Sequence, residues 1–324
     1  MKTNVFYSYN GRTAFDVILK NLKLKKSCHV LVPEYSCDVL FQNKKIRRVN
    51  YKFYETKNNF FFDLKKIKKR INKNTKVVLI INFFGIRQDT RELYDFCKKK
   101  KIFLIIDDCH TYYKDISFIK NKCDFAFFSP SKIFPKLSKI GLILNFNKSI
   151  FIKQKFQINI ITYLDILKSL IKKVLNWEKN KFKKRRPLYE ISNNLKSKFE
   201  IYHVKPLNYQ IKKINLIKIN YEKKIRIKNF EYWKKVCTSL KIRPVLSSNN
   251  IKHGCPLYFT AYVKDKKKKL MLFNYAWKNN INVCSWPTFY EKQIKNKRLL
   301  DIWENTIFFP MEKKYYQLNL EWKI

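Results

Sequence analysis

The sequence predicts an α/β fold: a mostly parallel sheet with helices on both faces, followed by a smaller C-terminal α/β domain. Two observations lead to this expectation. Short apolar runs alternate with helical patterns over the first 145 residues, which is typical of parallel strands joined by crossover helices. A second group of short strand and helix patterns begins near residue 255. We place the large domain at 1–187 and the helical connection with the small domain at 188–324.

The expected strands are apolar runs of the length typical of buried strands. The helical segments between them carry apolar residues three and four positions apart, as Leu93, Phe96 and Cys97 do. A first amphipathic helix opens at Asn10. The expected strands are 30–32, 77–81, 103–106, 125–128 and 142–144, and the later helices of this region are 63–70 and 90–100.

Long helical patterns follow residue 151. Apolar residues recur there at intervals of three and four, among them Leu164, Leu167 and Ile171, until a basic stretch at 181–187 breaks the pattern. Such a stripe fits either the surface of a membrane or packing on the same domain or on a second subunit, and we favour packing. The remaining expected elements are a helix over 210–240, a strand over 255–263, a helix over 266–279, and strands over 283–286 and 307–310.

The composition narrows the class of protein. The chain has 324 residues and a net charge of +47. The lysines are scattered among abundant Asn, Ile, Phe and Tyr, as an AT-rich coding sequence produces, so we expect no nucleic-acid partner; charge alone leaves a nucleic-acid or membrane-surface binder as an alternative. We expect neither a secretion signal nor membrane insertion, because the longest apolar run, 77–86, is too short to span a bilayer. Eight cysteines without metal-binding spacing favour free thiols in the cytoplasm and no metal site.

Polar residues follow four of the expected strands, at the point where each strand ends. The segments are 33–36, 82–85, 107–110 and 129–132. In open parallel sheets, ligands bind beyond the carboxyl ends of the strands. We therefore expect the four segments to converge on one ligand-binding site.

Three of these residues suit pyridoxal phosphate (PLP). The amine of Lys132 can form a Schiff base with the cofactor aldehyde, the carboxylate of Asp107 can keep the pyridine nitrogen protonated, and the hydroxyl of Ser129 can bind phosphate. Asp107 is preferred over Asp108 because it lies three residues before His110, which would pack near the ring. Asp108 is expected to be a structural neighbour. For His110, a packed histidine bonded to backbone remains the alternative.

The phosphate is expected at the start of the first helix. Backbone amides at a helix N-terminus bind anions, and Gly11 and Thr13 would allow close approach and add a hydroxyl. Arg12 either adds charge there or is an ordinary first-turn residue, and Lys139 is read as a surface or phosphate-facing charge. With only four glycines in the chain, we expect each to stand where the backbone requires it.

Together these motifs resemble the DegT/StrS family of PLP-dependent aminotransferases. The resemblance implies a fold type I transferase, a homodimer with its active sites at the interface, and transfer of an amino group from glutamate to a keto-sugar nucleotide in surface-polysaccharide or amino-sugar biosynthesis. The segments that carry it are Gly11-Arg12-Thr13-Ala14, 30–37, 82–85, Asp107-Asp108-Cys109-His110 and Ser129-Pro130-Ser131-Lys132, with 255–259, Trp286-Pro287 and 308–311 in the C-terminal part.

The resemblance also implies a role for each site residue. Lys132 would carry the cofactor and move the proton, Asp107 would pair with the pyridine nitrogen, and His110 would contact the side of the ring. Those that would hold the phosphate are Gly11, Arg12, Thr13 and Ser129. The retained Lys132 argues against the sugar dehydratases of the family, which have histidine there.

The chain departs from the family pattern at three places. Cys37 stands where many members have a ring-stacking aromatic residue, the turn at 136–141 keeps one glycine, and 202–203 offer no clear counterpart of the asparagine lent by the second subunit. These departures motivate a second hypothesis, in which the protein binds PLP but has lost efficient turnover and serves regulation or assembly.

Overall fold

The computed structural model describes most of the chain. The main described ranges are 4–41, 49–111, 116–134, 139–155, 205–217, 219–247, 254–290 and 296–318, with shorter pieces at 137, 164, 167, 171, 191–192, 251, 293 and 321–322. The predicted basic stretch 181–187, the domain boundary at 187, Lys136 and residues 202–203 lie outside the described residues. Of the predicted helical stripe after residue 151, Leu164, Leu167 and Ile171 are described, and all three are helical and exposed.

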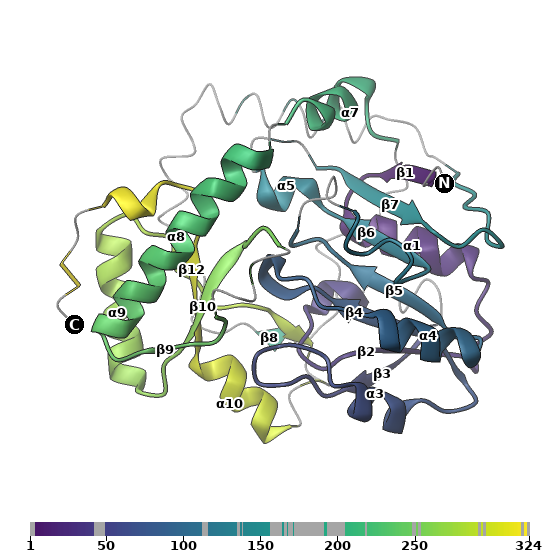
Figure 1. Cartoon of the computed structure of the whole chain (residues 1–324), viewed down its shortest axis with the longest axis horizontal. Helices are drawn as coiled ribbons and strands as arrows, with labels where there is room; N and C mark the ends of the chain where they lie inside the picture. Colours follow the sequence, from purple (N-terminus) through teal and green to yellow (C-terminus); the bar gives the residue numbers. More distant parts are fainter. Residues whose placement is uncertain are drawn as a thin grey trace.

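A seven-stranded sheet forms the larger part of the molecule (Figure 1). Its order is β1-β7-β6-β5-β4-β2-β3. Five adjacent strands, β3, β2, β4, β5 and β6, run parallel, whereas β7 is antiparallel to both β6 and β1. The strands are β1 (Asn4–Ser8), β2 (His29–Pro33), β3 (Asn50–Tyr54), β4 (Thr75–Ile81), β5 (Phe103–Asp107), β6 (Phe125–Phe128) and β7 (Gly141–Asn145).

Helices cover both faces of this sheet, because alternate residues of each buried strand point to opposite sides. On β4, Leu79 belongs to the apolar cluster that includes helix α1 (Gly11–Asn21), and its neighbour Ile80 belongs to the cluster under helices α3 (Leu64–Arg70) and α4 (Arg91–Lys99). The expected fold class, a mostly parallel sheet with helices on both faces, is confirmed.

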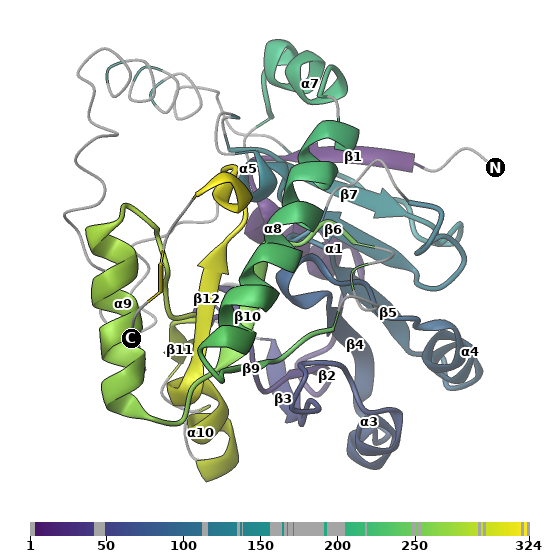
Figure 2. The same ribbon diagram turned by 60° about the vertical axis from the view of Figure 1, so that its left-hand side comes forward.

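A smaller α/β unit follows (Figure 2). Its three-stranded sheet has the order β12-β10-β9, and the long helix α8 runs beside it. The elements are α7 (Asn208–Asn215), α8 (Ile219–Ser239), β9 (Arg243–Pro244), β10 (Tyr258–Tyr262), α9 (Lys266–Lys278), β11 (Phe289–Tyr290), α10 (Lys297–Asn305) and β12 (Thr306–Pro310), and β11 pairs with β8 (Ile191–Ser192). Within the described part of the chain, no helix is long and apolar enough to cross a membrane.

The structure corrects several boundaries. Strands β1 and β3 were missed because they are the two edge strands, half exposed, and lack a continuous apolar run. The expected helix over 210–240 is two helices, since α7 ends before Leu216 and α8 begins at Ile219. The expected strand 283–286 is a single bridge between Cys284 and Phe308. Helix α10 was not predicted.

Candidate active site

The four segments that follow the parallel strands do meet, as predicted. The ring of Tyr35, after β2, lies 5.9 Å from that of Phe83, after β4. The N–H of Phe84, after β4, donates to Nδ1 of His110, after β5, at 3.2 Å. Gly11, at the start of α1, lies so close to the ends of β5 and β6 that a Cβ added to it would be 2.5 Å from Sγ of Cys109 and 3.4 Å from Cβ of Ser129. Residues from distant parts of the sequence therefore share one site at this edge of the sheet.

Asp107 is the last residue of β5 and is buried. Its Oδ1 accepts a hydrogen bond from the N–H of Cys109 at 2.9 Å. Burial raises the pKa of its carboxyl group, and the charge of Lys132 acts in the opposite direction. A buried carboxylate of this kind is held ionised by a cation placed beside it.

Asp108 has a different environment, because neighbouring strand residues point to opposite sides. It is fully buried. Its Oδ2 accepts from Nη2 of Arg87 at 3.0 Å and from Nε at 3.1 Å, and its Oδ1 accepts from Nδ2 of Asn82 at 2.8 Å. Asp108 thus joins the ends of β4 and β5, which is the structural role expected for it.

His110 is held in its neutral form. Because its Nδ1 accepts the Phe84 N–H, the ring proton sits on Nε2. Burial lowers the pKa of the imidazole well below its ordinary value, and the charge of Lys132 lowers it further. The ring lies nearly parallel to that of Phe84 and 5.2 Å from that of Trp286. His110 is therefore a rigid, uncharged side chain at the edge of the site. Its hydrogen bond to backbone agrees with the alternative interpretation, a packed histidine bonded to backbone.

Lys132 lies in the short helix α5 (Pro130–Ile133) that follows β6. Its backbone N–H donates to the carbonyl of Ser129 at 2.9 Å. The expectation of a desolvated amine is not met, since the side chain is exposed. Its charge shifts the pKa values of Asp107, His110 and Cys37, so all three lie around it.

The start of α1 departs in part from the expected phosphate cradle. Asn10 caps the helix, and its Oδ1 accepts the N–H of Thr13 at 2.9 Å, so one of the expected amides already has a partner. Thr13 itself is buried, whereas Arg12 is half-buried and lies near Cys37 and Asp38. Gly11 is the residue of this helix start that lies closest to Cys109 and Ser129.

Two residues of the site were missed in the sequence. Trp286 packs on His110 from the C-terminal part of the chain, and its carbonyl accepts the hydroxyl of Tyr35 at 2.6 Å. Arg226 is buried in α8 and donates to the carbonyls of Ile133 and Pro256, both at 2.9 Å, which fixes the end of the Lys132 turn. Trp286-Pro287 stood out only as a motif, and Arg226 is one of 71 basic residues.

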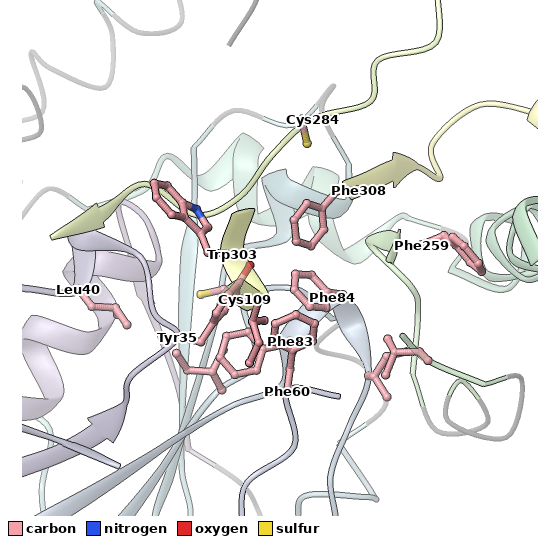
Figure 3. Close-up of a cluster of buried hydrophobic side chains, with 14 of the residues drawn as sticks. Tyr35, Leu40, Phe60, Phe83, Phe84, Cys109, Phe259, Cys284, Trp303 and Phe308 are labelled. Carbon is pink, nitrogen blue, oxygen red and sulfur yellow. The ribbon is translucent and has the colours of Figure 1, made fainter. Parts of the chain in front are cut away.

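The C-terminal part is joined to the large sheet beside the site. Figure 3 shows Phe60, Phe83 and Phe84 grouped with Tyr35 and with Phe308 of β12. A backbone hydrogen bond also joins the two parts there. The N–H of Cys255 donates to the carbonyl of Gly85 at 3.1 Å. Gly85 has a φ of +84°, at which a residue with a side chain would be strained. Backbone atoms crowd Gly85, Gly141 and Gly254, and the side chains of Cys109 and Ser129 crowd Gly11, so a side chain at any of the four positions would collide.

Gly11→Ala tests this close packing. The new Cβ would collide with Sγ of Cys109, so we expect loss of stability by about 1–3 kcal/mol and weaker cofactor binding. Cys109→Ala removes the sulfur, and the double variant should recover most of both losses. The measurements are thermal unfolding and PLP titration. Equal defects in the single Gly11 variant and the double variant would contradict the assignment.

Three comparisons place this geometry among known proteins. Residues 2–136 match the family model of class-V aminotransferases. A comparison with curated protein sequences finds no significant match. Among solved structures, NtdA from Bacillus subtilis with bound cofactor PMP has a TM-score of 0.62 and 13% identity, with 96% of this chain and 69% of that chain covered.

Two further structures show the same likeness. PseC from Helicobacter pylori, an aminotransferase involved in the biosynthesis of pseudoaminic acid, has a TM-score of 0.60 and 13% identity, with 98% of this chain and 83% of that chain covered. GDP-4-keto-6-deoxy-D-mannose-3-dehydratase from E. coli with bound hydrated PLP has a TM-score of 0.59 and 16% identity, with 95% of this chain and 83% of that chain covered. These structures share the architecture of this chain, and the predicted fold type I architecture is confirmed.

Proposed function

We propose that this chain, which has the fold type I architecture and a class-V aminotransferase match at its N-terminal end, is a PLP-dependent aminotransferase. The observation that carries the proposal is the gathering of Lys132, Asp107 and His110 at the carboxyl ends of neighbouring parallel strands. Their order in the sequence motivated the hypothesis, and the shifts of the Asp107 and His110 pKa values by the Lys132 charge support their proximity.

The residues of the site fit PLP. Asp107 is a buried carboxylate whose pKa is raised by burial, so a protonated pyridine nitrogen is a suitable partner. Lys132 is exposed, as an amine must be to reach an aldehyde. Ser129 and Gly11 lie side by side next to the start of α1, where the positive end of the helix dipole favours phosphate.

When bound, PLP supplies the electron sink for transamination. In this proposal Lys132 would hold PLP through its amine, and the amine, when free again, would move the proton to and from the reacting carbon of the donor. Asp107 would pair with the ring nitrogen and keep it protonated. His110, fixed in its neutral form, contacts the ring side and does not compete with Lys132 for the proton. Trp286 and Phe84 hold His110 in place and exclude water from that side.

The aminotransferase reaction is favoured over a sugar dehydratase reaction. Both activities occur among proteins of this fold, as the E. coli dehydratase illustrates. The dehydratases of the DegT/StrS family, which this chain resembles, have histidine in place of the site lysine, whereas this chain keeps Lys132. A lysine returns the proton within the active site, and transamination requires that proton transfer.

The finer parts of the proposal are the substrates and the setting. We infer glutamate as the donor and a keto-sugar nucleotide as the acceptor, in surface-polysaccharide or amino-sugar biosynthesis; the sugar-modifying activities printed for structural neighbours support this choice. A cytoplasmic setting is supported by eight cysteines that are all free thiols.

We also infer a homodimer. Leu164, Leu167 and Ile171 are helical, spaced three and four apart, and exposed by 48%, 54% and 47%. We expect sedimentation as a dimer at moderate salt, without binding to anionic vesicles. A monomer that floats with the vesicles at that salt would reverse the assignment.

The proposed function is tested on the purified protein loaded with PLP. Glutamate should convert the bound cofactor to its amine form, seen as loss of the visible band, and a keto-sugar nucleotide should restore the band. If PLP binds but no common amino donor changes the spectrum, the regulatory or assembly role takes over. If PLP does not bind, both hypotheses fail.

A further inference from the structure

The segment before β7 lies beside the start of α1. Strand β7 pairs with β1 so that Gly141 is opposite Ser8. The approach is so close that a Cβ added to Gly141 would be 2.3 Å from the carbonyl oxygen of Asn10, the residue that caps α1. Lys139, two residues earlier, is therefore brought to the same helix N-terminus as Gly11 and Arg12.

Lys139 makes defined contacts there. Its Nζ donates to the hydroxyl of Tyr9 at 3.0 Å and lies 5.2 Å from the centre of the Tyr9 ring. Tyr9 is only 4% exposed, so it is a rigid support for the amine. The pKa of Lys139 is lowered, first by partial burial and second by the charge of Arg12, which places the two cations within electrostatic reach of each other.

Asp38 lies near Arg12 and offsets part of its charge. Two cations held close to each other still favour an anion bound beside them. The α1 N-terminus, with its partial positive charge, adds to the same field. Ser129, from the strand end that leads to Lys132, lies against Gly11 on the inner side. An anion at this place would thus meet two side-chain cations, a helix N-terminus and a hydroxyl.

We infer that Lys139, supported by Tyr9, binds the phosphate of the cofactor together with Arg12. The inference rests on the proposed function. In this inference Lys139 touches the phosphate directly, and Tyr9 holds the lysine amine in position. A divalent phosphate ester suits two cations better than a carboxylate does.

The test compares PLP with pyridoxal, which has the aldehyde but no phosphate. Lys139→Met should weaken PLP binding on the order of tenfold, whereas pyridoxal binding should be unchanged. Lys139→Arg should restore most of the PLP affinity. Tyr9→Phe should weaken PLP less than Lys139→Met, because the amine keeps its charge but loses its support. Lys148→Met, at an exposed turn on the far side of β7, is the matched control and should behave as wild type.

A second probe does not depend on the cofactor. Inorganic phosphate should raise the unfolding temperature of the wild-type and Lys148→Met proteins, and should do so less for Lys139→Met. The inference is wrong if Lys139→Met keeps wild-type PLP affinity and phosphate response, or if PLP and pyridoxal weaken equally. A wild-type protein that binds phosphate but neither PLP nor pyridoxal would instead defeat the proposed function, and with it the identity of the anion.

Discussion

Lys132→Ala is expected to abolish turnover. Without the amine, the protein cannot hold the cofactor covalently or return the proton to the donor, and the donor half-reaction should slow by about 10⁴-fold or more. Sodium borohydride should no longer fix PLP to the protein. The fold should survive, because the side chain is exposed and forms no part of either apolar cluster.

The matched control for this variant is Lys120→Ala, an exposed lysine in a turn after β5. It should keep both the borohydride-fixed cofactor and the half-reaction. The measurement is stopped-flow absorbance with saturating amino donor, with unfolding curves for both variants. A Lys132→Ala protein that turns over the donor at a rate near wild type would remove Lys132 from the proposed chemistry.

Asp107→Asn is expected to separate cofactor capture from catalysis. The amide is of equal size but cannot hold the pyridine nitrogen protonated, so the donor half-reaction should slow roughly a hundredfold or more. Lys132 is unchanged, so PLP should still bind and borohydride should still fix it there. The readouts are the visible spectrum and the rate of conversion of bound PLP to its amine form.

The stability of this variant should move in the other direction. The folded-state pKa of Asp107 is raised by burial. The folded protein therefore binds the proton of this carboxyl group more tightly than the unfolded chain does, and stability is lost as pH rises through the folded-state pKa. Asparagine removes this loss, so the cofactor-free variant should unfold at pH 7 at a temperature no lower than wild type.

Asp108→Asn is the control for position. From the sequence alone it was expected to be mild, but the structure indicates a cost of about 3–5 kcal/mol, because it leaves Arg87 buried without its carboxylate partner. The half-reaction rate of the folded, PLP-loaded fraction should nonetheless stay within severalfold of wild type. If Asp108→Asn stops the half-reaction and Asp107→Asn reacts normally, the register of the site at the end of β5 is wrong by one residue.

Much of the sheet could be predicted because its buried strands are continuous apolar runs. β4 and β5 are buried on both faces, so no polar alternation interrupts them. The edge strands β1 and β3 face solvent on one side and gave no such signal. The direction of β7 could not be predicted from the sequence, because an apolar run does not show whether a strand is parallel or antiparallel to its neighbours. The antiparallel pairing of β7 with β1 shows its direction.

The candidate site was predictable where chemistry and sequence order coincide, and not where it depends on contacts across the fold. Asp107, His110 and Lys132 follow consecutive strands, so the rule for parallel sheets brings them together. Trp286 and Arg226 reach the same place from far along the chain. Trp286-Pro287 stood out only as a motif without a place in the site, and nothing local marks Arg226. The exposure of Lys132 likewise depends on how the short helix α5 packs.

The central claim is that Lys132 is the residue that carries the cofactor. The most direct measurement is to incubate the purified wild-type protein with PLP, reduce it with sodium borohydride, digest it and locate the label by mass spectrometry. We predict a yellow protein whose visible band disappears on reduction, with the phosphopyridoxyl group on Lys132. A protein that stays colourless with excess PLP, or a label on another lysine, would contradict the account.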